Sequence, residues 1–431
     1  MKTEPPYKER IRKESDLGLA RLTADPHQVG LSEESLRKIS LTVQKFIDSN
    51  QLAGATTIVA RHGKVAYFET LGMRNLEEQK PLEKDTIFRI YSMTKPIAAV
   101  AVMMLCEEGK LELDAPVMKY LPELGSMSVA KNSESDKVTL GSANREMTVR
   151  DLMRHTSGLP GAIRYMAGTT GVDKLFRQAG LDRLHECNLA EMVARLGSVP
   201  LLYHPGEKWH YSIAADVLGR LIEVSSQQSF DVFLTERIFR PLGMVDTDFY
   251  VPTKKNDRLA AMYGLNPKGN LRTIDAPQGG TGNLSPVAYT KKPKFLSAGG
   301  GLVATATDFM RFCLMLLNKG TLNGIRMLEQ ESVEEMTRNQ LPQSLIPLDK
   351  KPEERYTGLG FGLGVSVRVH RTNWVPSSQV GEYGWIGGTS TEFWISPQDE
   401  LVTITLAQHL PFSNLSEIIK PMVYAAIVEG K

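Results

Sequence analysis

The chain has 431 residues, of which 42% are hydrophobic and 23% are charged, as in an ordinary folded globular protein. Its formal net charge of +2 lacks the strong basic excess that nucleic-acid binding requires, so we expect no nucleic-acid partner. The longest apolar run, residues 96–106, is too short to cross a bilayer, and residues 1–15 lack the apolar core of a secretory signal. We therefore expect a cytoplasmic protein with no membrane partner.

The first part of the chain is expected to contain a polar extension, an amphipathic helix and two strands before a long apolar helix. Apolar side chains recur at helical spacing from Leu36 to Ile47, behind the candidate N-cap Ser32. Two β-rich runs follow, and the sequence RHGK between them is typical of a hairpin turn. The elements predicted here are an extension at 1–30, a helix at 32–50, strands at 55–60 and 65–70, an extended piece at 88–91 and a helix that starts after Ser92 and ends near Gly109.

The middle of the chain is richer in helical periodicity and loops, and the last third returns to strands. Residues 132–144 are polar and serine-rich, which predicts a surface loop. Pro421 falls inside the last predicted helix and should bend it. The elements predicted here are helices at 189–196, 213–224, 307–317 and 415–428 and strands at 363–369, 391–395 and 401–407.

This order of elements predicts one sheet assembled from the two ends of the chain. The two amino-terminal strands and three carboxy-terminal strands can complete an antiparallel sheet around an inserted helical region. The predicted fold class is therefore α+β, with the antiparallel sheet flanked by helices. The predicted domains are an N-terminal extension (1–30), a discontinuous sheet domain (31–115 and 291–431) and a mainly helical domain (116–290).

The spacing Ser-x-x-Lys occurs three times, starting at Ser35, Ser92 and Ser128. A serine hydroxyl is a poor nucleophile unless a base takes its proton, and a lysine three residues later lies on the same helical face. The serine should also open a buried helix, whose amide groups stabilise an oxyanion away from water. Only Ser92 precedes a long apolar helix, so Ser92 and Lys95 are the candidate nucleophile and its partner. A helix cap followed by a solvated lysine is the alternative.

Two later segments follow this motif along the chain. Residues 205–212 (PGEKWHYS) form a turn that delivers Tyr211 to a helix start, and residues 384–389 (GWIGGT) precede a β-run. With Ser-x-x-Lys, they resemble the Tyr-Ser-x and Lys-Thr-Gly elements of the serine β-lactamase and penicillin-binding-protein superfamily. The chain most resembles the family VIII carboxylesterases, which are similar to class C β-lactamases and carry Trp-x-Gly in the third position. Residues 152–160 (LMRHTSGLP) also resemble the superfamily's His-Thr-Ser-Gly-Leu segment.

The resemblance implies a β-lactamase/transpeptidase-like fold and an acyl-enzyme mechanism. It implies that Ser92 is the acylated nucleophile and that Lys95 is its proton acceptor or field source. Tyr211 would be the second member of the base pair and would pass the proton to the leaving group. Whether Lys95 or Tyr211 takes the first proton stays open, because the two would titrate as a coupled pair. The oxyanion hole would combine the backbone N–H groups of Ser92 and Gly388.

The third motif departs from that of peptidases and β-lactamases at Trp385, where those enzymes carry a lysine that holds the substrate carboxylate. Its loss favours neutral esters packed against an indole face. Ile213 stands where Tyr-x-Asn would place an amide, which again favours apolar acyl groups. A core tryptophan and a helix isoleucine are the alternatives at these two positions. Together with Met93 and with Gly387, where a substrate backbone must approach closely, they are the expected substrate-binding residues.

The expected function is a serine hydrolase that cleaves short-chain carboxylic esters, with weak β-lactam turnover left open. The alternatives are an acyltransferase of the same family, a β-lactamase or D-amino-acid peptidase, and a non-catalytic ligand-binding relative. No metal or other cofactor is expected, because neither the histidines nor the cysteines have metal-ligand spacing. His155 is expected to be structural, and residues 299–301 (GGG) to form a turn beside the active site. The sequence leaves monomer and homo-oligomer open.

Overall fold

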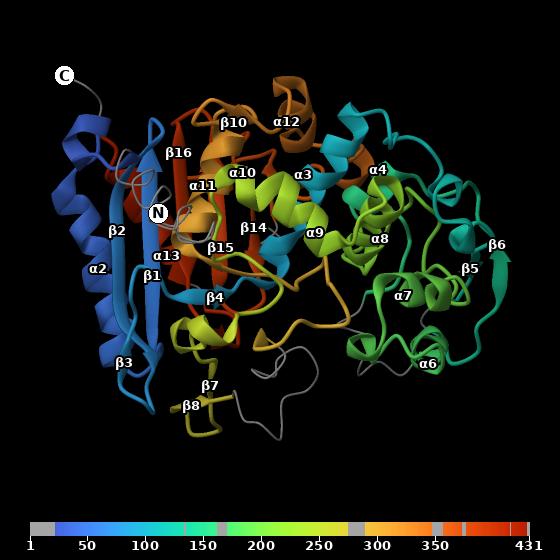
Figure 1. Cartoon of the computed structure of the whole chain (residues 1–431), viewed down its shortest axis with the longest axis horizontal. Helices are drawn as coiled ribbons and strands as arrows, with labels where there is room; N and C mark the ends of the chain where they lie inside the picture. The colour runs from blue at the N-terminus through green and yellow to red at the C-terminus, as the bar shows by residue number, and fades with distance from the viewer. Residues whose placement is uncertain are drawn as a thin grey trace, which may run out of the picture.

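The computed structural model describes residues 22–132, 135–161, 170–274, 289–346, 357–372, 376–413 and 415–428. An eight-stranded antiparallel sheet carries the fold, in the order β12-β13-β14-β15-β16-β1-β2-β3 (Figure 1). Strands from the two ends of the chain therefore meet inside the sheet, where β16 pairs with β1. The strand bounds are β1 Gly54–Arg61, β2 Lys64–Asn75, β3 Lys80–Pro81, β12 Leu359–Phe361, β13 Ser366–Arg368, β14 Tyr383–Gly387, β15 Thr391–Ser396 and β16 Leu401–Leu406.

Two helices from opposite ends of the chain cover one face of this sheet (Figure 1). They are α2 (Glu33–Asp48) and α13 (Leu415–Ala425), which pack on each other and on a small core that includes Val59 of β1 and Trp394 of β15. The apolar stripe predicted for the first helix faces this core, because residues three and four apart share one side of a helix. Its buried members are Leu36, Ile39 and Val43.

The other face of the sheet carries α11 (Ala306–Leu317) and, beyond it, the helical part of the molecule (Figure 1). Between them runs α3 (Thr94–Glu107), in which every residue from Thr94 to Leu105 is buried. A helix that is apolar all round must be covered on all sides, so α3 lies in the interior and packs on α8 (Ala214–Ser226). The other α-helices that lie within the described residues are α4 (Val149–Met153), α6 (Gly171–Gln178), α7 (Leu189–Leu196), α9 (Phe230–Leu234), α10 (Arg240–Leu242) and α12 (Gln330–Thr337).

Short strand pairs connect the helical part to the sheet and close its loops. Strand β4 pairs with β9, and the segment that contains Ser92 directly follows β4. The other pairs lie in the connections between helices and after the last long strand. The bounds are β4 Ile87–Arg89, β5 Ser128–Ala130, β6 Leu140–Ser142, β7 Tyr263–Leu265, β8 Leu271–Thr273, β9 Val303–Thr305, β10 Thr321–Leu322, β11 Ile325–Arg326 and β17 His409–Leu410.

The predicted α+β class with an antiparallel sheet is confirmed, but the sheet has more strands than predicted. The strand predicted at 363–369 is wrong in extent, because Gly364 has φ of 85° and turns the chain, so that only β13 is extended there. The glycine-containing segment before the β-run is itself strand β14, paired with β15. Glycine has low strand propensity, so the neighbouring strands rather than the local sequence make this segment extended.

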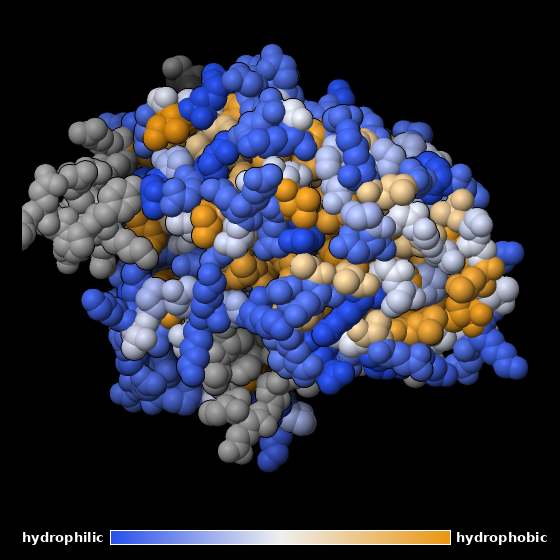
Figure 2. Space-filling model, turned by 45° about the vertical axis from the view of Figure 1, so that its right-hand side comes forward, coloured by the Kyte–Doolittle hydropathy of each residue, from blue (hydrophilic) through white to orange (hydrophobic). Residues whose placement is uncertain are grey.

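The predicted division into a sheet domain and a helical domain stays a prediction, and residues 1–21 of the predicted extension lie outside the described residues. In the described part of the chain, no helix is both long and apolar enough to span a bilayer. On the face shown in Figure 2, hydrophobic residues form separate patches among hydrophilic ones.

Candidate active site

Ser92 lies in a 3₁₀ turn (Tyr91–Met93), and α3 begins directly after this turn. Tyr91 has φ of 43°, a left-handed conformation that is unfavourable for a residue with a side chain. Such strain persists only where the surrounding structure imposes it. Here the N–H of Ile90 donates to the carbonyl of Leu302 at 3.1 Å, which ties the strained turn to a neighbouring segment. The fold therefore fixes the backbone on which Ser92 stands.

Lys95 brings its ammonium group to the Ser92 hydroxyl from the first turn of α3. Its Nζ lies 3.1 Å from Ser92 Oγ. The residue is only 6% exposed, so its polar head needs hydrogen-bond partners within the protein. Nζ also donates to the carbonyl of Gly299 and lies 4.6 Å from the centroid of the Tyr211 ring, where a cation is attracted to the aromatic face. The turn predicted at 299–301 thus lies beside Ser92.

Tyr211 reaches the same hydroxyl from a different element. Its OH donates to Ser92 Oγ at 2.8 Å, and its backbone lies in the loop directly before α8. Ser92 Oγ therefore has the lysine amino group and the tyrosine hydroxyl at hydrogen-bond distance, and either group can take the serine proton when it is itself deprotonated. The structure brings the three predicted catalytic residues together, and the role of each stays a prediction.

His155 supports the loop that carries Tyr211. Its ring lies 4.7 Å from the Tyr211 ring, and its Nδ1 accepts the N–H of Ser212 at 3.3 Å. Complete burial, together with the charges of Lys95 and His210, lowers the pKa of His155 well below its usual range. His155 is therefore neutral near pH 7, and it acts as a hydrogen-bonded support beneath Tyr211.

The end of β14 lies against the segment that precedes Ser92. A Cβ on Gly387 would overlap with Thr391 Oγ1 and with the carbonyl oxygen of Ile90, so only glycine allows this close approach. Gly388 follows the last pair of the β14–β15 ladder and is exposed, and a Cβ on it would meet no atom within 4 Å. Gly388 therefore borders open space next to the Ser92 turn, where an oxyanion and its substrate could sit.

All four expected substrate-binding residues, Trp385, Gly387, Ile213 and Met93, are buried. Trp385 is 5% exposed and packs edge-on against Phe361, with ring centroids 5.1 Å apart, and 5.6 Å from the Tyr211 ring. Met93 and Ile213 are 0% and 1% exposed. Their side chains belong to the core beneath the site, so in this conformation they shape it by packing and present no surface to a substrate. The alternative of a core tryptophan also fits the burial of Trp385.

Two groups at the site were not identified from the sequence. One is the carbonyl of Gly299, whose turn was predicted but whose contact with Lys95 was not. The other is the buried carboxylate of Asp216, which accepts the N–H of Gly299 at 2.9 Å. The available signal was an acidic residue among apolar ones in the first turn of the helix after Tyr211, a position that also suits the helix dipole.

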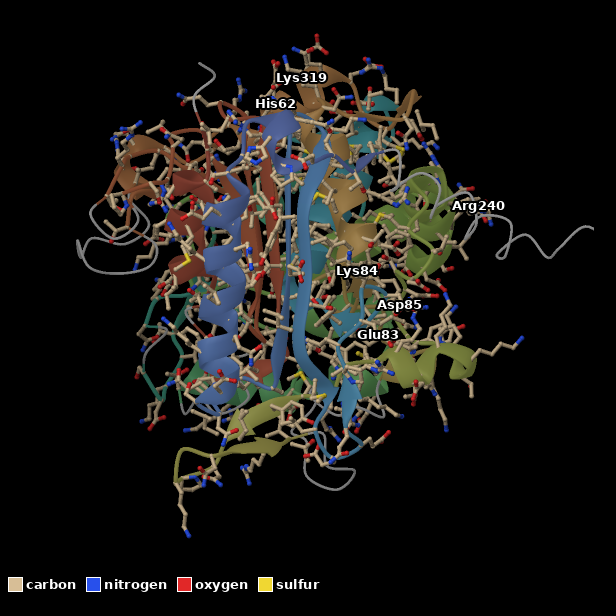
Figure 3. All side chains as sticks on the ribbon, turned by 90° about the vertical axis from the view of Figure 1, so that its left-hand side faces the viewer. His62, Glu83, Lys84, Asp85, Arg240 and Lys319 are labelled. Atoms are coloured by element: carbon tan, nitrogen blue, oxygen red, sulfur yellow. The ribbon has the colours of Figure 1, made fainter. Side chains whose placement is uncertain are left out.

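Away from Ser92, the described residues offer no candidate metal site and a large groove. Among the described residues, no group of three or more His, Cys, Asp or Glu side chains is placed to hold a metal ion. A groove of about 650 Å³ lies beside β2, and Figure 3 shows two of its lining residues, Lys84 and Asp85, at the edge of that strand. None of Ser92, Lys95 and Tyr211 lines this groove.

Comparison with known proteins gives matches over most of the chain. The family described as Beta-lactamase matches residues 39–418. Protein Rv1367c of Mycobacterium tuberculosis is 32% identical over 374 residues, 86% of this chain and 89% of that protein. Esterase EstB of Burkholderia gladioli is 32% identical over 295 residues, 67% of this chain and 71% of that protein. The structure of EstCE1, described as a hydrolase with promiscuous acyltransferase activity, has the same fold, with a TM-score of 0.77 at 24% identity over 91% of this chain and 99% of that one.

Proposed function

The chain belongs to the β-lactamase family and is a serine hydrolase, and we propose that it cleaves short-chain carboxylic esters through an acyl-enzyme on Ser92. The observation that carries this proposal is the position of Ser92 Oγ between Lys95 Nζ and Tyr211 OH. The proposal also assigns the chain to the family VIII carboxylesterases, on the Trp-x-Gly form of its third motif. Cytoplasmic location stays a prediction.

The proposed reaction has two steps that share one proton-transfer pair. Ser92 Oγ attacks the ester carbonyl while its proton passes to the deprotonated member of the Lys95–Tyr211 pair, and the ester C–O bond then breaks as the pair protonates the departing alkoxide oxygen. Water then attacks the acyl-enzyme, gives its proton to the same pair, and releases the carboxylic acid and the free serine. The negative charge on the carbonyl oxygen in each step would be stabilised by the N–H groups of Ser92 and Gly388.

The proposed substrate class follows from the residues that surround the reacting groups. Trp385 packs beside Tyr211 and against Phe361. At the position of Trp385, the β-lactamases and peptidases that the chain resembles carry a lysine that holds the substrate carboxylate. An aromatic environment without that cation favours neutral esters over carboxylated peptides. Weak β-lactam hydrolysis is a secondary proposal, because the same acyl-enzyme chemistry applies to a strained amide.

A second candidate function is acyl transfer to an alcohol. It is favoured by the similarity to EstCE1, which is described as a hydrolase with promiscuous acyltransferase activity. The acyl-enzyme is the same, and an alcohol takes the place of water in the second step. Adding an acceptor alcohol to the assay distinguishes the two, because transfer gives a new ester whereas hydrolysis gives only the acid.

The test of the proposed function is intact-mass measurement after mixing the protein with p-nitrophenyl butyrate. We expect one butyryl adduct per chain, and no adduct in Ser92→Ala. The matched controls are Ser35→Ala in α2 and Ser128→Ala in β5, which remove the serines of the other two Ser-x-x-Lys copies and should keep the adduct. Absence of both adduct and turnover in the unmodified protein would exclude the proposed function.

A further inference from the structure

Asp216, in the first turn of α8, lies behind the Ser92 site and belongs to none of the three motifs. It is 5% exposed, and its Oδ1 accepts the backbone N–H of Gly299 at 2.9 Å and the hydroxyl of Ser297 at 2.7 Å. The contact is close, because a Cβ on Gly299 would lie 2.9 Å from Asp216 Oδ2. The carboxylate therefore holds the turn at residues 297–299 by two hydrogen bonds.

The same turn holds Lys95 from its other side. The carbonyl of Gly299 accepts a hydrogen bond from Lys95 Nζ, and this Nζ lies 3.1 Å from Ser92 Oγ. Gly299 thus donates to Asp216 and accepts from Lys95. Because Asp216 holds the N–H of Gly299, it also holds in place the carbonyl of Gly299 that accepts from Lys95 Nζ.

Packing on both sides makes this turn a link between two helices. Gly219 lies one helical turn after Asp216, and a Cβ on it would be 3.1 Å from the Cβ of Ala298, so α8 approaches the turn closely. On the opposite side, the N–H of Leu302 donates to Thr94 Oγ1 of α3 at 3.2 Å. The turn therefore connects α8, which follows Tyr211, to α3, which carries Lys95.

Burial raises the pKa of Asp216 above its usual range, and its hydrogen bonds together with the positive charge of Lys95 offset only part of this rise. The Asp216 carboxyl group and the Lys95 amino group lie on opposite sides of Gly299, and each is hydrogen-bonded to that residue.

We propose that Asp216 is a positioning residue that fixes the 297–299 turn, so that the carbonyl of Gly299 holds Lys95 Nζ against the Ser92 hydroxyl. This inference rests on the proposed function, because it concerns the acylation of Ser92. Asp216 acts through Gly299 and Lys95. Its loss should therefore slow acylation and leave substrate binding largely unchanged.

The test measures the acylation rate constant from the burst of p-nitrophenol released by p-nitrophenyl butyrate. Asp216→Ala removes the acceptor for Gly299, and we expect acylation about 100-fold slower with KM changed less than about 3-fold, since misplacement by an ångström has effects of this size. Asp216→Asn keeps an oxygen for the Gly299 N–H and loses the charge, so an intermediate rate is expected. Acylation by Asp216→Ala within about 3-fold of the unmodified protein would overturn the inference.

The matched control is Asp308, another buried carboxylate in the first turn of a helix. Its Oδ2 accepts the backbone N–H of Asp246 at 2.7 Å and the hydroxyl of Thr247 at 2.9 Å. Asp216 likewise accepts one backbone N–H and one hydroxyl. We expect Asp308→Ala to lower Tm and to leave acylation within about 2-fold. If acylation falls equally in the Asp216 and Asp308 variants, the effect is general destabilisation and the proposal is wrong.

A double variant separates positioning of Lys95 from any other role. If Asp216 acts through Lys95, adding Asp216→Ala to Lys95→Ala should change the residual acylation rate less than about 3-fold. If Asp216→Ala lowers the acylation rate of Lys95→Ala by as large a factor as it lowers that of the unmodified protein, the proposal is wrong. Failure of the unmodified protein to form an adduct would instead remove the proposed function itself, and the inference with it.

Discussion

Ser92 Oγ contacts two groups that come from different elements, Lys95 from α3 and Tyr211 from the loop before α8. The two groups also contact each other, with Lys95 Nζ 4.6 Å from the centroid of the Tyr211 ring. Removal of either should therefore impair both attack by Ser92 and release of the alcohol.

Tyr211→Phe should lower kcat/KM by about 10²- to 10⁴-fold, the usual range for loss of a general acid–base group, and should leave Tm nearly unchanged. Steady-state kinetics with p-nitrophenyl butyrate and thermal denaturation check both parts. Tyr67→Phe is the matched control, because its OH also contacts a serine hydroxyl, that of Ser40 at 2.8 Å, in another part of the molecule. Full activity in Tyr211→Phe would contradict the assignment.

Asp308 should make stability depend on pH in a defined window. Burial and the neighbouring Asp246 charge raise its pKa to about 7, from 3.8. Between these values the unfolded chain loses the proton while the folded protein keeps it, so the contribution to stability is present below about pH 4 and is lost as pH rises to about 7. We expect the free energy of unfolding of Asp308→Asn, relative to that of the unmodified protein, to be higher at pH 8 than at pH 4. Urea denaturation at the two pH values measures it. A difference independent of pH would refute this.

At the scale of elements, the end of β14 determines how closely the sheet approaches the turn that contains Ser92. Gly387 lies in the ladder against Thr391 and beside the carbonyl of Ile90, whereas Gly388, the next residue, borders open space. Two adjacent glycines thus have different reasons for lacking a side chain. Gly387 allows the strand to pack on the Ser92 turn, and Gly388 leaves open space in front of that turn.

These two glycines should respond differently to alanine. Gly387→Ala introduces overlaps with Thr391 and Ile90, so we expect both a lower Tm and at least about 10-fold lower kcat/KM. Gly388→Ala meets no atom within 4 Å, so Tm should stay the same while kcat/KM falls, because the methyl group enters the space proposed for the substrate. A large loss of Tm in Gly388→Ala, or normal activity in both variants, would argue against this arrangement.

At the scale of the whole molecule, one continuous core joins the sheet to the helical part. The largest cluster of buried side chains includes Ile404 of β16, all of the apolar positions of α3, and Leu221 of α8. Both parts pack on α3, and Ser92 lies in the turn directly before it. A shared core of this kind predicts one cooperative unfolding transition.

Phe309→Ala tests this coupling from the sheet side. Phe309 is fully buried in α11 and contacts Phe312 and Phe393, so its truncation should cost about 3–5 kcal/mol. Far-ultraviolet circular dichroism and tryptophan fluorescence should shift together in urea, since both parts unfold together. Val232→Ala, at a side chain that is 42% exposed, should change stability by less than about 0.5 kcal/mol. Two separate transitions would disprove the shared core.

The sequence by itself determined the elements whose signals are local. The three-residue spacing of Ser92 and Lys95 and the apolar helix behind them predicted both a buried α3 and the contact between the two side chains. The order of the motifs added Tyr211, and the apolar stripe of α2 was evident from its period. These succeed because helical spacing and amphipathicity depend on neighbours three or four residues apart.

Only the tertiary structure decided the contacts between distant residues. It made the glycine-containing segment at 383–387 a central strand, and it buried Met93 and Ile213 beneath the site instead of beside a substrate. It also placed the Asp216 carboxylate on the N–H of Gly299, 83 residues away. No local pattern specifies such contacts, because they depend on how the sheet, α3 and α8 pack together and on which polar groups that packing buries.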